Sequence, residues 1–237
     1  MSFTTTTHDD HDHGHGHGPA VEGAENPGGH HEPAELRDHK ERLALWMFIA
    51  GDALFLILMV FSWFYLRTLN SNGMWDAAQC TTANPCEDGL GNPIVAQITR
   101  ADPWHAVIIA GLTILAAGFV WLAEIGAKKN TTKGAISGPA GIAFLFMVLA
   151  IAMQIYQFQV LPFTTIDGGY ASTYEFFMGS TLAHLLILAF IGLGLWIRSS
   201  RGRHAGGTWY RVRLIRFFAV WVALSTVILT VVGSLFA

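Results

Sequence analysis

Five blocks of apolar sequence, each long enough to cross a bilayer, constrain this chain more than any other feature. A helix needs roughly 20 predominantly apolar residues to span the hydrocarbon core. The chain is 52% hydrophobic and only 13% charged, whereas soluble domains carry about 25% charged residues. The sequence therefore predicts an all-α, polytopic membrane bundle with five transmembrane helices, at about 44–66, 104–125, 138–161, 174–197 and 214–236.

Basic residues determine the expected orientation of these spans. They precede the first span and gather between spans two and three and between spans four and five, whereas the other junctions hold only Arg67 and Arg100. Loops rich in Lys and Arg stay on the cytoplasmic side, so we expect a cytoplasmic N-terminus and an outside C-terminus. The formal net charge is -3 at pH 7, and no basic patch interleaved with aromatic residues indicates nucleic-acid binding.

Residues 1–35 differ from the rest of the chain, because they are rich in His, Asp and Gly. Such a segment cannot bury a core. We expect a disordered, His-rich cytoplasmic tail followed by one transmembrane domain over 36–237. The spacing of the tail histidines defines no metal geometry, so no metal site is assigned. The polar stretch "PAELRDHKER" (33–42) is predicted to be a helical lead-in to the first span.

Both cysteines, Cys80 and Cys86, lie in the loop predicted to be outside the membrane. That compartment oxidises thiols, so we expect a disulfide in preference to free thiols. A copper or zinc site is the third alternative, but no nearby His or Met has a ligand spacing.

Polar residues inside the spans are the candidates for function, because each is costly in hydrocarbon. Asp52 is the one charged residue between Arg42 and Arg67. Gln154 and Gln157 are three residues apart in the third span and share a helix face. In the fourth span, Thr181 and His184 lie within one turn of each other.

These residues argue against a redox centre within this chain. Haem held by two imidazoles needs two histidines at matching depth, and His184 has no counterpart in another span. A single membrane histidine more often bonds a neighbouring helix. Glu124 lies near the end of its span, where we expect it to reach water. Trp46 and Trp63, near the two ends of the first span, are expected to be interface anchors.

Three stretches resemble a known family. "LALWMFIAGDALFLILMVFSWFYLR" is similar to a family span with Leu-x-x-Trp-x-Phe-x-Ala-x-Glu, in which Asp52 takes the position of a buried glutamate. "FMGSTLAHLLI" occupies the place of Thr-Gly-x-His-Gly-x-His-Val, with Gly179 and His184 matching. "AMQIYQFQVLPFTTIDGGYASTYEFF" is the most specific stretch, matching at Phe163, Thr164, Asp167, Gly168, Tyr170, Ser172 and Thr173. The family is subunit III of the haem-copper oxidases, in its five-span bacterial form.

The chain departs from the family pattern at several positions. Asp52 is one methylene shorter than the family glutamate, Gln157 replaces a second glutamate, and Thr181 replaces a histidine. In the last span only Trp221 matches Trp-His-x-x-Asp-x-x-Trp. The family's Glu–His pair is therefore lost, and Gln157 is expected to bond His184 or Thr181 instead. The chain resembles a divergent member.

The resemblance implies a non-catalytic accessory subunit of a proton-pumping terminal oxidase in aerobic respiration. It implies docking on catalytic subunit I, with subunit II, as a multi-pass protein of the bacterial plasma membrane. Haem and copper would lie in those partner subunits, and this chain would bind phospholipid and support proton uptake and durability. The residues with a proton- or lipid-associated role would be Asp52, Gln154, Gln157, Thr181 and His184, and those with a structural role Trp46, Asp167, Gly168, Tyr170, Ser172 and Thr173.

Two alternatives remain open at this point. One is an accessory subunit of another membrane redox assembly, such as a nitric oxide reductase or an oxidase joined to a quinol-oxidising complex. The other is a small transporter that acts alone. The electron donor of an oxidase, cytochrome c or quinol, is not encoded in a subunit III sequence.

Overall fold

A computed structural model describes residues 34–70, 75, 86–87, 93–94, 100–129, 133–165, 168–202 and 209–235. Its five long helices are all long and apolar enough to cross a membrane, which confirms the five predicted spans. Two short strands pair antiparallel between the first two helices. In chain order the elements are α1 (Ala34–Thr68), β1 (Cys86–Glu87), β2 (Pro93–Ile94), α2 (Pro103–Lys128), α3 (Lys133–Val160), α4 (Gly169–Ser200), α5 (Trp209–Thr230) and a π-helical turn, η2 (Val231–Leu235).

Some sequence predictions fall outside this description. Residues 1–33 of the predicted tail, Cys80 and Asp167 lie outside the described residues. Cys86 is described only as part of the backbone of β1, so the expected disulfide stays a prediction. The polar lead-in is helical and continuous with the first span, because α1 begins at Ala34.

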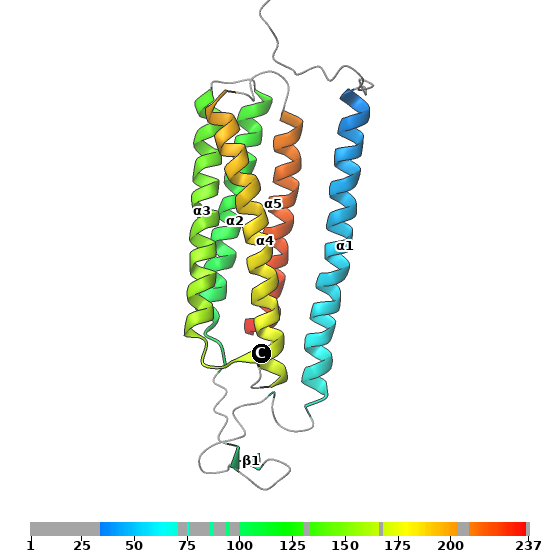
Figure 1. The fold of residues 1–237 in the computed structure, drawn as a ribbon, viewed down its shortest axis with the longest axis vertical. Helices are drawn as coiled ribbons and strands as arrows, with labels where there is room; N and C mark the ends of the chain where they lie inside the picture. The colour runs from blue at the N-terminus through cyan, green and yellow to red at the C-terminus, as the bar shows by residue number, and fades with distance from the viewer. Residues whose placement is uncertain are drawn as a thin grey trace, which may run out of the picture.

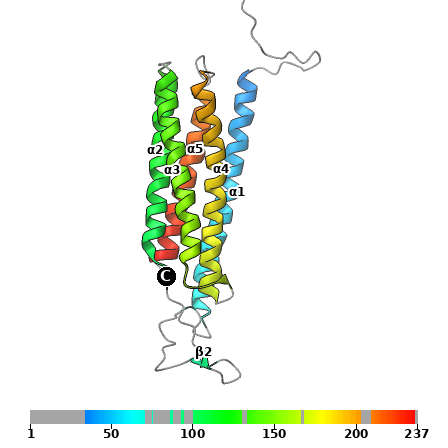
Figure 2. The same ribbon diagram turned by 60° about the vertical axis from the view of Figure 1, so that its left-hand side comes forward.

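Helices α2, α3, α4 and α5 form a four-helix unit, and α1 stands to one side of it (Figures 1 and 2). Helix α2 packs extensively on α3 and α5, and α3 packs on α4, whereas α1 has a smaller contact with α4 and α5. The end of α5 and the start of α1 lie at opposite ends of the bundle (Figure 1). The side of the membrane on which each end lies remains a prediction.

Local sequence chemistry explains where two helices begin. The Asp102 carboxylate accepts a hydrogen bond from the Trp104 backbone N–H at 3.0 Å, and Pro103 occupies the first position of α2. Both features favour a helix start. Gly168 precedes α4 with φ at 138°, a conformation that side chains with a Cβ rarely adopt. The glycine of the family motif is therefore required by the backbone.

An aromatic cluster joins α1, α4 and Trp75 of the connection between α1 and α2 at one end of the bundle. Trp63 is fully buried there, with its ring 4.8 Å from that of Trp75 and 5.1 Å from that of Phe177. The expectation that Trp63 is an interface anchor is therefore wrong, because packing against α4 removes it from the surface. Trp46, near the other end of α1, is 48% exposed, as expected of an anchor.

Candidate functional site

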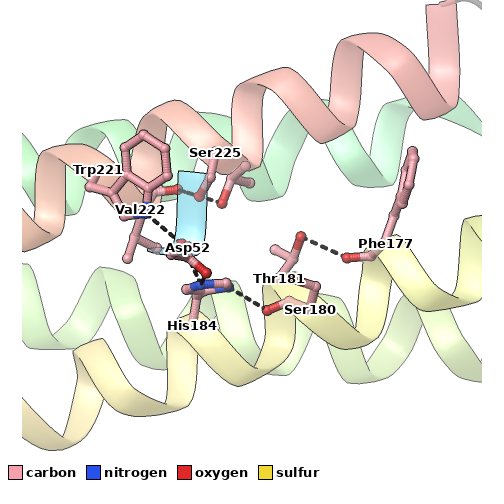
Figure 3. Close-up of polar contacts among 9 residues, drawn as sticks. Asp52, Phe177, Ser180, Thr181, His184, Trp221, Val222 and Ser225 are labelled. Atoms are coloured by element: carbon pink, nitrogen blue, oxygen red, sulfur yellow. Dashed lines mark hydrogen bonds and ion pairs between the residues drawn. The ribbon is translucent and has the colours of Figure 1, made fainter. Parts of the chain in front are cut away.

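Asp52 lies at the contact between α1, α4 and α5. His184 Nε2 of α4 is 2.9 Å from both carboxylate oxygens of Asp52. Trp221 of α5 donates its indole N–H to Asp52 Oδ2 at 2.6 Å. Figure 3 shows the carboxylate between these two rings. One polar side chain of α1 thus bonds both α4 and α5, the helices on which α1 packs.

The hydrogen bonds of His184 define how protons are arranged in this group. Its Nδ1 lies 2.7 Å from the Ser180 carbonyl oxygen, which can only accept, so Nδ1 carries a hydrogen. Nε2 therefore either donates to an ionised Asp52 or accepts from a protonated Asp52. In both states one proton is shared and the pair has no net charge, and its polar atoms have partners, as a buried polar group requires.

The contact of Asp52 with α4 confirms that His184 bonds a neighbouring helix. The two side chains are 14% and 13% exposed, respectively. Around them the contact of α1 with the other helices is largely apolar, and apolar surfaces alone drive little association between helices in lipid. The Asp52–His184–Trp221 group therefore holds α1 at a defined position on the four-helix unit.

The predicted glutamine pair forms a separate polar group. Gln154 Nε2 donates to Gln157 Oε1 at 3.3 Å, and Gln157 Nε2 donates to the Tyr174 hydroxyl at 2.9 Å. The expectation that Gln157 bonds His184 or Thr181 is wrong. The His184 ring is already paired with Asp52, and Thr181 donates to the Phe177 carbonyl at 3.0 Å in its own helix.

Trp221 is the site residue that sequence reasoning did not select. In the sequence it stands out only as the one residue of the last span that matches the family motif. Its signal is an indole N–H inside an apolar span, since such a donor needs an acceptor when it is buried. Asp52 is that acceptor.

Glu124 of α2 also lies differently from expectation. Its side chain is 1% exposed, and its oxygens lie 2.9 Å from Lys128 Nζ and 2.5 Å from Arg216 Nε. The expectation that Glu124 reaches water is therefore wrong. Arg216 of α5 covers it, and this guanidinium in turn lies 4.5 Å from the centre of the Phe217 ring. Glu124 thus links α2 to α5 through buried charge.

The family-motif residues at the start of α4 have structural contacts. The Ser172 and Thr173 hydroxyls both donate to the Gly169 carbonyl, at 3.2 and 2.6 Å. The Tyr170 hydroxyl accepts from the Ala101 backbone N–H at 3.2 Å, which joins the start of α4 to the segment before α2. Within the described part of the chain, no three His, Cys, Asp or Glu side chains gather as a possible metal site.

Comparison with known proteins agrees with the family resemblance. A cytochrome c oxidase subunit 3 of Trichophyton rubrum is 28% identical to this chain over 162 residues, which are 65% of this chain and 52% of that protein. The chain thus spans about half the length of this curated relative. No protein-family model matches it. Together, this similarity and the five long apolar helices fit a divergent subunit III of the cytochrome c oxidase family.

Proposed function

We propose that this chain is a non-catalytic accessory subunit of a proton-pumping terminal oxidase in aerobic respiration. It packs on catalytic subunit I, beside subunit II, and those partners hold the haem and copper. The similarity to a cytochrome c oxidase subunit 3 supports this. We place the protein in a bacterial plasma membrane, on the basis of its five-span form. The observation that carries the proposal is the position of α1, which Asp52 holds beside the four-helix unit.

A groove follows from this position of α1. It has a volume of about 320 Å³ and lies between α1, α4 and α5. Its walls are entirely apolar, so the groove suits an acyl chain better than a polar ligand. The residues that line it are Leu45, Phe48, Ile187, Ile191, Leu214, Ile215 and Phe218.

A basic and aromatic pocket adjoins this groove. Leu214 lines both, and the pocket also contains Arg42 and Trp46 of α1 and Arg213 of α5. The Arg213 Nε atom is buried and has no hydrogen-bond partner among the described residues. A phosphate group would supply that partner, because guanidinium groups bind phosphate oxygens well. The pocket and groove together thus fit a phospholipid, with its headgroup at the arginines.

The same geometry supports an indirect role for Asp52. If the bound lipid covers the face toward subunit I, loss of the Asp52 contacts lets α1 move and the groove change shape. We expect lipid loss and shorter turnover life rather than an immediate loss of oxygen reduction. Proton uptake would then depend on Asp52 only indirectly, through the position of α1 and the bound lipid.

Purification of the intact assembly from native membranes tests the assignment. We expect haem-bearing partners in the mass spectrum of the complex, with the absorption spectrum of an oxygen-reducing oxidase. A nitric oxide reductase partner would contradict the proposal, and so would a chain that purifies without any haem protein.

Lipid extraction from the same preparation tests the groove. The double variant Arg42→Gln/Arg213→Gln should retain less phospholipid than the wild type. Arg198→Gln is the matched control, because Arg198 is an exposed arginine at the end of α4 that does not line the pocket. Equal phospholipid content in both variants would refute lipid binding at this place while leaving the oxidase assignment standing.

A further inference from the structure

A small polar chamber lies inside the four-helix unit, apart from the lipid groove. It is bounded by α2, α3, α4, α5 and η2, and all of its polar side chains are uncharged. We call it the polar chamber. Its polar lining includes Gln154, Gln157, Tyr174, Thr226, Thr230 and Ser234.

The chamber has room for water. The space open to the centre of a water molecule is about 30 Å³, and one ordered water occupies roughly 10–15 Å³. About two water molecules therefore fit.

The hydrogen bonds around the chamber are incomplete. Gln157 donates to the Tyr174 oxygen, so the Tyr174 O–H proton remains free to donate. Gln154 donates to Gln157, and its own Oε1 accepts nothing from the described residues. Ser234 lies close enough to Tyr174 to interact with it, yet its buried Oγ makes no hydrogen bond of normal geometry there. Donors and acceptors are thus both left over.

The threonines of the chamber add acceptors. Thr226 donates to the Val222 carbonyl at 2.8 Å, and Thr230 donates to the Ala106 carbonyl at 3.4 Å. Each hydroxyl oxygen still has a lone pair to offer. Water donates and accepts and has no charge, so it matches this lining better than an ion does.

We propose that the polar chamber is a hydration site, where ordered water joins Tyr174 and Gln154 to Ser234. The π-helical turn η2 is part of the site, because Ser234 belongs to it. Turns of this type often mark functional positions. The water completes a neutral hydrogen-bond chain that links α3, α4 and η2. Thr181 also lines the polar chamber, and it precedes His184 by about one turn of α4.

Magnetisation transfer from water, measured by solid-state NMR on the full chain in lipid bilayers, tests the proposal. The side-chain amides of Gln154 and Gln157 should receive it several times faster than the backbone amide of Val120, which is fully buried in α2. Gln159 is exposed and supplies the fast reference. Transfer at Gln154 and Gln157 as slow as at Val120 would overturn the proposal. So would transfer from lipid protons in place of water.

A pair of variants locates the water. Ser234→Val replaces the hydroxyl by methyl groups and should abolish the fast transfer to Gln154 and Gln157. Thr113→Val is the control, because Thr113 is buried in α2 and donates only to Ile109 and Ala110 of its own helix. Fast transfer that persists in Ser234→Val refutes the site as described. If that variant does not fold, the wild-type comparison still decides.

Discussion

Removal of the Asp52 carboxylate should loosen α1 from the other helices. In Asp52→Ala, the Trp221 N–H and His184 Nε2 both lose their partner. Hydrogen bonds between membrane helices contribute about 0.6–1.7 kcal/mol each, so the loss of two should cost about 1–3 kcal/mol. For a chain of this size, roughly 2–4 °C of Tm corresponds to 1 kcal/mol. We therefore expect Tm to fall by about 2–12 °C.

Asp52→Asn is the matched control for this experiment. The asparagine oxygen can still accept from Trp221, and its NH₂ group can donate to a neutral His184 ring. Such a ring keeps its Nδ1 hydrogen on the Ser180 carbonyl. Both contacts survive, so Tm should shift by less than about half the Asp52→Ala change. Thermal unfolding in detergent, at one protein and lipid concentration, provides the comparison.

A double-mutant cycle with His184→Ala sharpens the test. Because Asp52 and His184 touch, the effects of Asp52→Ala and His184→Ala should not add, and a coupling energy of about 0.5–2 kcal/mol should remain. Full additivity would show that the pair does not hold the helices together. Equal destabilisation by Asp52→Asn and Asp52→Ala would show that charge, rather than hydrogen bonding, is what matters.

Two further changes test the fold on which the site depends. Glu124→Ala should destabilise the protein by about 3–5 kcal/mol, since it leaves Arg216 without its buried partner. Loss of the half-exposed Lys128 side chain should cost at most about 1 kcal/mol. Equal thermal unfolding midpoints for the two variants would contradict this reasoning. Gly168→Ala should destabilise the protein by about 1–3 kcal/mol, because the residue has a φ of 138°. Gly179→Ala is the control and should not destabilise the protein, since Gly179 lies in a helix with open space around it. Thermal unfolding midpoints of the two variants provide the comparison.

The residues of the site could be selected from sequence more readily than their partners. Asp52 and His184 stand out because each is a costly group inside an apolar span. Their pairing joins residues 132 positions apart and depends on α1 lying beside α4. Hydropathy contains no information about which spans are neighbours, so the pairing was not predicted. The family resemblance predicts that Gln157 bonds His184 or Thr181, whereas Gln157 bonds Tyr174.

Residues near span ends show a second limit. At such a depth a long acidic side chain can either reach water or bond a neighbouring helix. The sequence alone leaves both possibilities open for Glu124. The position of Arg216 on α5 decides between them. Trp63 is similar, because a tryptophan near a span end can anchor at the interface or pack inside. The aromatic rings of Trp75 and Phe177 decide for packing.

The sequence by itself determined the number of spans and their approximate bounds. Backbone groups in hydrocarbon must bond within one helix, and the bilayer sets the length of each apolar block. Only the tertiary structure decided which polar residues meet. It separated Asp52, His184 and Trp221 from the chamber around Gln154 and Gln157. The physical reason is that lipid favours every apolar helix face about equally, so specific packing and a few polar contacts select the neighbours.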